Sequence, residues 1–436
     1  MSVKTPDWVE DQTPLSHKLI RIILFISSFT WTVNPIQDFM GDSTPLEKVA
    51  TRMIPLILVA GYCLQGKHRS RLKNLFRPLM LPMIWYILLG TLGGLTGIQP
   101  VLTIWKGTEV TIALMWMAVS CYDADSTRRE FIALMRCTEV LLAITVILAF
   151  ANPALGFQRS ASVIPWMKGY YPIINPNALG FMSVFALTRL LFFPAKYKIP
   201  RMMLVSFTLL CAQSRTSYAV TGLVLLFFVI EGIRNKQLGR VFIAMAFGLF
   251  AMCLALGWFD TIVQIFMRGQ DAEGFSSLSG RTNYWDFTLE HVSWIGGGLA
   301  TGARSLIFLS ENAFYKGLVG THNSFVEALI GAGYIGAIPF IAMQGWFFIR
   351  QAARTLTVPT ESNFLFLCFG CIFFARGMTS MVLALYSFDF VAFTMYFAWQ
   401  LSTDQKPAAP LPRPKPTVYE KTLKEMEQAS PSESNA

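Results

Sequence analysis

The sequence predicts an all-α, polytopic membrane protein, and three observations lead to this fold class. Of its 436 residues, 53% are hydrophobic and only 14% are charged. The apolar residues form repeated blocks close to the ~20 residues that a helix needs to cross a bilayer. The blocks are apolar on all sides and include small-residue patches such as Gly90-Thr91-Leu92-Gly93-Gly94. They therefore suit closely packed helices and lack the alternation of a membrane β-barrel.

About twelve helices are expected to span the membrane. Lys and Arg gather in alternate connections between the apolar blocks, and by the positive-inside rule this distribution places both termini in the cytoplasm. The basic connections are residues 67–73, 128–129, 196–201, 234–240 and 350–354. The expected spans are residues 19–33, 49–65, 78–98, 101–122, 131–151, 177–193, 202–213, 217–233, 241–258, 323–348, 363–385 and 386–401.

The longest connection, residues 259–322, is then expected to form a large periplasmic loop with short helices. A first helix would begin at Ser279 as its N-cap and end at Gly296-Gly297-Gly298. One apolar face of this helix is expected to rest on the membrane surface, and it consists of Trp285, Leu289 and Val292. A second short helix is expected around residues 303–309.

Residues 1–401 are predicted to form one transmembrane domain, and residues 402–436 a cytoplasmic tail. The tail contains the proline-rich run from Pro407 to Pro416 followed by polar residues. This composition cannot bury a core, so the tail is expected to be extended and disordered.

The net charge and the cysteines exclude two other kinds of protein. A net charge of +10 would suggest nucleic acid as the partner of a soluble protein, but here membrane topology explains it. No nucleic-acid partner is therefore expected. All seven cysteines lie within or beside apolar blocks, so neither a disulfide framework nor a zinc site is predicted, and no cofactor is expected.

Three residues on the outer side share a chemistry: Arg215, Arg281 and His322. A guanidinium group can hold phosphate oxygens in two parallel hydrogen bonds, and an imidazole can take a proton from a sugar hydroxyl. Together they suit group transfer from a diphosphate leaving group. The alternative is that each arginine anchors a helix end to lipid phosphates and the histidine caps a helix.

At these residues the chain resembles the superfamily of O-antigen ligases and polymerases. The resemblance covers roughly residues 175–345, and its motifs occur in the family's order. They are Asn175-Pro176-Asn177, Gln213-Ser214-Arg215-Thr216, Ser279-Gly280-Arg281 followed by Trp285, Gly296-Gly297-Gly298, and His322-Asn323 followed by Gly333-Tyr334-Ile335-Gly336.

The resemblance implies a GT-C-like, metal-independent, inverting glycosyltransferase of the bacterial inner membrane, with its active site facing the periplasm. The donor would be an undecaprenyl-diphosphate-linked glycan, and the acceptor either lipid A core or another glycan, so ligation and polymerisation both stay open. Arg215 and Arg281 would hold the diphosphate, and His322 would act as the base. Arg304, Lys316 and Asn323 are further candidates for substrate binding.

Two further patterns in the sequence are typical of other functions. Asp123-Ala124-Asp125 has the spacing of a metal-binding motif, but it precedes a helix, where aspartates are common caps. Charges within apolar blocks often mark a transport pathway, so a lipid-linked glycan flippase or other transporter is the alternative function. Lys106 and Arg136 each have a glutamate three residues later. Arg52, Arg189 and Arg376 have no partner visible in the sequence.

Overall fold

The structure is a computed structural model, and it describes residues 13–29, 49–77, 80–97, 99–158, 165–236, 281–309 and 321–403. The expected span 241–258, the expected cap Ser279, the candidate Lys316 and the tail beyond residue 403 lie outside these ranges. In the described part, the strands form only two short antiparallel hairpins, β1 (Phe157–Gln158) with β2 (Trp166–Met167) and β3 (Gly169–Tyr170) with β4 (Ile173–Ile174).

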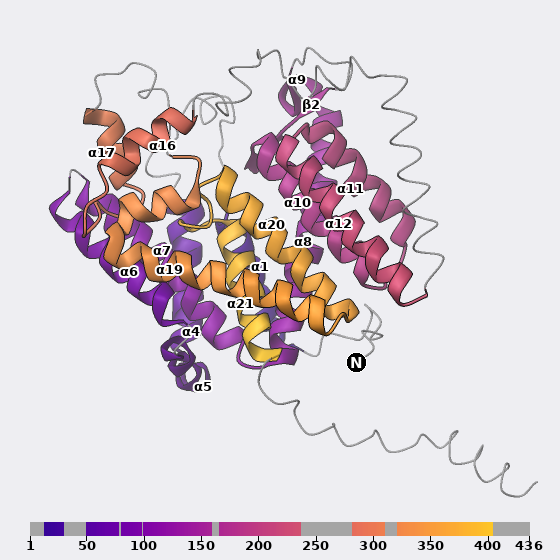
Figure 1. Cartoon of the computed structure of the whole chain (residues 1–436), viewed down its shortest axis with the longest axis horizontal. Coiled ribbons are helices and arrows are strands. Elements are labelled where there is room, and N and C mark those ends of the chain that lie inside the picture. Colours follow the sequence, from indigo (N-terminus) through magenta and orange to yellow (C-terminus); the bar gives the residue numbers. More distant parts are fainter. Residues whose placement is uncertain are drawn as a thin grey trace, which may run out of the picture.

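Helices make up most of the described chain, as the sequence predicts (Figure 1). They are α1 (Leu15–Ser27), α4 (Ile54–Leu64), α5 (Gly66–Arg69), α6 (Leu81–Gly93), α7 (Pro100–Ser120), α8 (Ala124–Ala151), α9 (Pro153–Gly156), α10 (Pro176–Phe192), α11 (Lys198–Ala212), α12 (Arg215–Arg234), α16 (Arg281–Glu290), α17 (Gly302–Leu309), α19 (Ser324–Thr357), α20 (Glu361–Thr379) and α21 (Phe388–Thr403).

Among the described residues, four helices are long and apolar enough to cross a bilayer: α8, α12, α19 and α20. The helices α1, α4, α6, α10, α11 and α21 have 11 to 17 residues each, which is shorter than the ~20 residues of a typical span. A helical membrane protein is confirmed. Twelve spans stay a prediction.

Side-chain caps fix where several helices begin. Asp123 starts α8 with a capping box, because its carboxylate accepts from the N–H of Ser126 at 2.7 Å and the Ser126 hydroxyl accepts from the N–H of Asp123. Asn175 caps α10 and Ser214 caps α12. The cap gives Asp123 a structural role, which supports the interpretation of Asp123-Ala124-Asp125 as the start of a helix.

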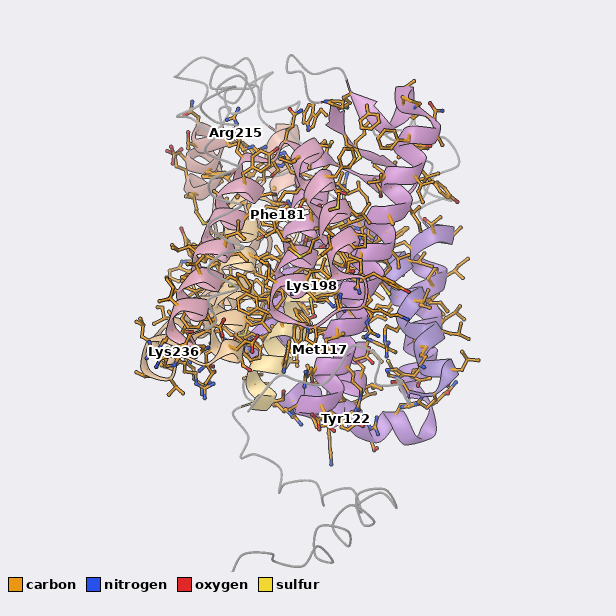
Figure 2. The ribbon with its side chains drawn as sticks, turned by 90° about the vertical axis from the view of Figure 1, so that its right-hand side faces the viewer. Met117, Tyr122, Phe181, Lys198, Arg215 and Lys236 are labelled. Carbon is orange, nitrogen blue, oxygen red and sulfur yellow. The ribbon has the colours of Figure 1, made fainter. Side chains whose placement is uncertain are left out.

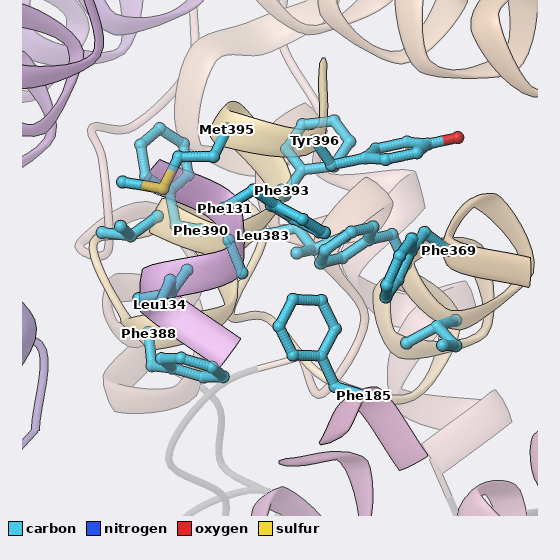
Figure 3. Close-up of a cluster of buried hydrophobic side chains, with 14 of the residues drawn as sticks. Phe131, Leu134, Phe185, Phe369, Leu383, Phe388, Phe390, Phe393, Met395 and Tyr396 are labelled. Atoms are coloured by element: carbon cyan, nitrogen blue, oxygen red, sulfur yellow. The ribbon is translucent and has the colours of Figure 1, made fainter. Parts of the chain in front are cut away.

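Aromatic rings fill the core where α8, α10, α20 and α21 meet (Figure 3). Phe131 of α8 packs edge-to-face on Phe185 of α10 and on Phe369 of α20, with ring centroids 5.3 and 4.9 Å apart. Edge-to-face pairs of this kind are favoured over face-to-face stacks. This core holds the long helices side by side.

The helix α19 is broken at Gly333, whose φ of 68° and ψ of 178° are not helical. In an unbroken helix the N–H groups of Tyr334 and Ile335 would donate to the carbonyls of Ile330 and Gly331. Here Tyr334 and Ile335 donate to Ser293 and Trp294 at 3.1 and 3.3 Å, and the two freed carbonyls accept from Gly297 and Gly298, both at 2.9 Å.

Two of the glycine motifs in the sequence therefore meet in space. A Cβ on Gly333 would lie 2.4 Å from the carbonyl oxygen of Trp294, and one on Gly296 would lie 2.3 Å from that of Gly331. Only glycine permits this approach of the two backbones. The expectation that Gly296-Gly297-Gly298 ends a helix was wrong, because α16 ends at Glu290 and the glycines dock on the break in α19.

The helices α16 and α17 lie at one end of the bundle, over α19 (Figure 1). We refer to this end as the upper end. The expected second short helix is confirmed as α17. The side chains of α16 that the protein buries are Tyr284 and Thr288, whereas Leu289 of the expected apolar face is exposed. Contact of that face with the membrane surface stays a prediction. The helix packs on protein, and that packing decides which face is buried.

Candidate functional site

His322 lies in a tight turn immediately before α19. Its φ of 51° is in the left-handed region, which few side chains other than glycine adopt. The hydroxyl of Thr321 bridges this turn, since it lies 2.8 Å from the carbonyl oxygen of Asn323 and accepts from the Asn323 N–H at 3.3 Å. The side chain of Asn323 caps α19 by accepting from the N–H groups of Phe325 and Val326. The histidine backbone is thus held on both sides.

A hydrogen bond connects this turn to α16. The indole N–H of Trp285 donates to the carbonyl oxygen of Thr321 at 2.7 Å. Because Trp285 lies one turn after Arg281 on the same helix, this bond positions the arginine relative to the histidine. The hydroxyl of Thr321 also lies 3.0 Å from the buried carboxylate of Glu327. Neither Trp285 nor Glu327 was expected to support the site.

Two arginines act on the imidazole of His322. The ring is half-buried, and this burial, with the positive charges of Arg281 and Arg376, lowers the pKa of His322 from 6.5 to about 4. Burial also lowers the pKa of Arg281, but a guanidinium group stays protonated at any relevant pH. At neutral pH the site therefore holds a neutral imidazole beside a cation.

Arg376 is a further cation close enough to act on His322, and the sequence did not predict its place beside the candidate site. It lies in the last turns of α20 and is buried, with two nitrogens 3.0 and 3.1 Å from the same carboxylate oxygen of Asp389. Its guanidinium carbon lies 4.8 Å from the centre of the Phe181 ring. In the sequence it was only an intramembrane charge, and its basic character was the one signal that could have linked it to a phosphate site.

Arg215 begins α12 at the upper end of the bundle (Figure 2). The turn that carries it packs closely on α10, because a Cβ on Gly180 would lie 2.6 Å from the hydroxyl of Ser217 and 2.8 Å from Cβ of Ser214. The next residue of α10 is Phe181, on which Arg376 lies. Figure 2 shows Arg215 nearer the upper end than Phe181. The Arg215 turn and Arg376 thus contact neighbouring residues of α10, and α10 connects this turn to the residues around His322.

The three further candidates for substrate binding have different surroundings. Arg304 is an exposed residue of α17, and its charge acts on Lys106 and Glu327. The side-chain oxygen of Asn323 is occupied as a helix cap. Lys316 lies outside the described residues. The structure therefore brings His322 and Arg281 together, and the roles of these three residues stay predictions.

The arginines that favoured a transporter have acidic partners on other helices. Arg52 Nε lies 3.1 Å from Glu109, which also accepts from Lys106 at 2.9 Å as the sequence spacing predicts. Arg189 pairs with Glu139, and Arg376 with Asp389. Because each partner is distant in the sequence, local spacing could not identify the pairs.

Comparison with known proteins supports the resemblance stated above. Residues 201–341 match the family model described as O-antigen ligase. A search of curated proteins gives no match. The matched stretch contains Arg215, Arg281 and His322, together with both glycine motifs that meet at the break in α19. This match supports the resemblance of residues 201–341 to the O-antigen ligase and polymerase superfamily.

Proposed function

We propose that this protein transfers a glycan from a polyprenyl-diphosphate carrier to a hydroxyl group of an acceptor. The observation that carries the proposal is the neutral imidazole of His322, held in a fixed turn beside Arg281. The imidazole can accept a proton, and the guanidinium group can hold phosphate oxygens. The match to the O-antigen ligase family model supports a lipid-linked glycan and an acceptor as substrates in general terms.

In the proposed reaction, a ring nitrogen of His322 takes the proton of the acceptor hydroxyl as that oxygen attacks the anomeric carbon of the donor. The bond from this carbon to the diphosphate oxygen breaks, and its electron pair leaves with the polyprenyl diphosphate. A single displacement inverts the anomeric configuration. Arg281 and Arg215 stabilise the leaving charge, so the reaction needs no metal ion. The imidazolium then releases its proton to water.

We assign a different role to Arg376. Its guanidinium group already contacts Asp389, so its charge is partly balanced within the protein. Its remaining field still disfavours a second positive charge on His322. Arg376 therefore acts as a positioning residue that keeps the imidazole neutral, whereas Arg281 faces the donor.

Substitution of His322 tests the proposal. We expect purified His322→Ala to lose on the order of 10²–10⁴-fold in transfer rate, the usual range for a positioned general base, with donor binding nearly unchanged. His291→Ala is the matched control, because His291 is an exposed histidine at the end of α16, and it should retain the wild-type rate. Full turnover by folded His322→Ala would exclude the base.

The transporter alternative predicts a different result in the same preparations. The transporter hypothesis rested on three arginines that have no partner visible in the sequence. Ion pairs with Glu109, Glu139 and Asp389 account for these arginines. A flippase would move lipid-linked glycan at an unchanged rate in His322→Ala and would show no transfer in either protein. Flipping assays in vesicles beside the transfer assay distinguish the two functions.

We further propose that the protein lies in the bacterial inner membrane, with the upper end facing the periplasm. Lys and Arg in alternate loops support this orientation. A cysteine introduced at the exposed Asn283 of α16 should react with a membrane-impermeant thiol reagent from outside. One at the exposed Ser70 should react only after permeabilisation. The reverse pattern would place the site in the cytoplasm and overturn the substrate assignment.

The acceptor is either lipid A core or another lipid-linked glycan, because both reactions use the same donor site. Glycan analysis of a deletion strain distinguishes them. Loss of long chains from lipopolysaccharide identifies a ligase, whereas single-repeat glycans or lost exopolysaccharide identify a polymerase.

A further inference from the structure

A cavity of about 440 Å³ lies between α8 and α11, away from the candidate site. Arg136, Glu139, Lys196 and Arg201 line its polar part, and apolar side chains such as Val140 and Leu204 line the rest. Lys196 belongs to the turn between α10 and α11, and Arg201 to the first turn of α11. This turn is at the opposite end of α11 from Gln213 and Arg215.

The polar part of the cavity carries an excess of positive charge. Three cationic side chains line it against one carboxylate. Both oxygens of that carboxylate are engaged within the protein, since Glu139 Oε1 accepts from Arg189 and Oε2 accepts from Arg201 at 2.7 Å. Arg189 adds a further buried positive charge behind the cavity wall. The cavity is therefore suited to an anion.

Two apolar stripes extend from this cavity toward the upper end. On α8 the stripe consists of Val140, Ile144 and Ile147, and on α11 it consists of Met203, Phe207 and Leu210, all of them exposed. Each set follows helical spacing of i, i+4 and i+7, so each forms one face of its helix. The stripes adjoin, because the rings of Phe150 on α8 and Phe207 stack with centroids 5.9 Å apart.

The height of the cavity in the bundle fits a lipid. Figure 2 shows Lys198, in the first turn of α11, below Phe181 and above Lys236 and Tyr122. The turn between α10 and α11 therefore ends short of the lower rim of the bundle. A basic cavity at this level, with apolar stripes above it, has the polarity profile of one phospholipid molecule in a bilayer leaflet.

We infer that this cavity binds the phosphate headgroup of an anionic phospholipid in the leaflet opposite to the candidate site. The phosphate contacts Arg136, Lys196 and Arg201, and the acyl chains lie along the stripes on α8 and α11. A soluble phosphate could satisfy the cations, but it would leave the stripes unused. The site lies outside the proposed donor site and does not depend on the transfer reaction.

Lipid retention by the full chain tests this site. Wild-type protein in detergent, titrated with phosphatidylglycerol or phosphatidylcholine, should retain phosphatidylglycerol preferentially in native mass spectra. Arg136→Gln with Lys196→Gln removes two cations and leaves the contacts of Glu139 with Arg189 and Arg201 intact. Since each basic residue near an anionic lipid surface contributes roughly 1 kcal/mol, this double variant should bind phosphatidylglycerol on the order of 10- to 30-fold more weakly.

Control variants separate loss of the cavity from general loss of charge and from loss of folding. Lys198→Gln with Lys236→Gln removes the same charge outside the cavity lining and should retain the lipid. Lys196→Gln alone changes an exposed side chain, so it should fold even if the double variant does not, and it should still weaken binding by several-fold. Equal retention of both lipids, or equal loss in the variants inside and outside the cavity, would overturn the site. Displacement of phosphatidylglycerol by millimolar inorganic phosphate would show that the ligand is a soluble anion and not a lipid.

Discussion

The charged side chains of the bundle interior differ from Arg281 of the candidate site in how they are paired. Inside the bundle, Glu130 contacts both His17 and Arg21, and Glu139 contacts both Arg189 and Arg201. Such charges are costly in a bilayer unless they are neutralised. Within the described residues, no carboxylate forms an ion pair with Arg281. The interior pairs connect helices, whereas we propose that Arg281 binds the substrate.

The largest expected effect breaks an interior pair. Arg189→Gln removes a fully buried cation and leaves Glu139 with the partly exposed Arg201 as its remaining partner, so we expect a loss of about 3–5 kcal/mol in the free energy of unfolding. Yield and thermal denaturation in detergent measure this loss. The transfer rate per folded molecule should stay at the wild-type value, and a selective loss of rate would show that interior pairs take part in the chemistry.

A change of nearly equal size is expected at the site, in activity and not in stability. Arg281→Ala should lower the transfer rate by roughly 10²–10³-fold, as for the loss of one group that stabilises a developing charge. Arg281→Lys keeps the charge without the planar fork and should lie between this variant and wild type. Arg69→Ala serves as the control, because Arg69 is an exposed arginine of the short helix α5. Wild-type rates for both Arg281 variants would reject the phosphate clamp.

A smaller effect is expected from a substitution that changes the backbone geometry near the site and leaves every charge in place. Gly333→Ala alters no charge, but it forces a side chain into a backbone with φ of 68° and within 2.4 Å of the Trp294 carbonyl. We expect a loss of about 1–3 kcal/mol in stability, together with a lower rate because the loop before α19 shifts. Gly345→Ala is the control, since no atom lies within 4 Å of its Cβ position. Identical behaviour of the two variants would show that the break has no strict geometry.

The smallest effect concerns pH. Because the pKa of His322 is lowered to about 4, the imidazole stays neutral down to that pH, and kcat/KM should fall only as the pH approaches 4. A bound diphosphate offsets the positive field of Arg281, so the pKa of His322 should rise in the complex. We therefore expect the acid limb of kcat at higher pH than that of kcat/KM. Coincident limbs would mean that the diphosphate does not lie beside this histidine.

Sequence patterns predicted the features that depend on nearby residues. The helices follow from apolar blocks, and the cap at Asp123 follows from residue type and position. The pair of Lys106 with Glu109 follows from a spacing of three residues. In each case the interacting groups are within one turn of each other, so the chain itself determines the contact.

Contacts between distant residues could not be predicted in this way. In the sequence, α19 and most of α20 separate Arg376 from His322, and only the packing of α20 beside α19 brings its charge to the imidazole. The bond from Trp285 to Thr321 likewise depends on how α16 docks on the bundle. The low pKa of His322 arises from these contacts, so the sequence suggested an ordinary value near 6.5.

The break in α19 also bears on how the protein is made. Residues 293–298 leave the ribosome before Ile330, Gly331, Tyr334 and Ile335, whose backbone groups they bind. The glycine segment can therefore form these hydrogen bonds only after α19 has been synthesised, and α19 cannot complete its own hydrogen bonds by inserting alone. Once the two meet, the turn that holds His322 is fixed at the start of the same helix. We therefore expect assembly of the end that carries the candidate site to be a late step of biosynthesis, coupled to insertion of the tenth expected span.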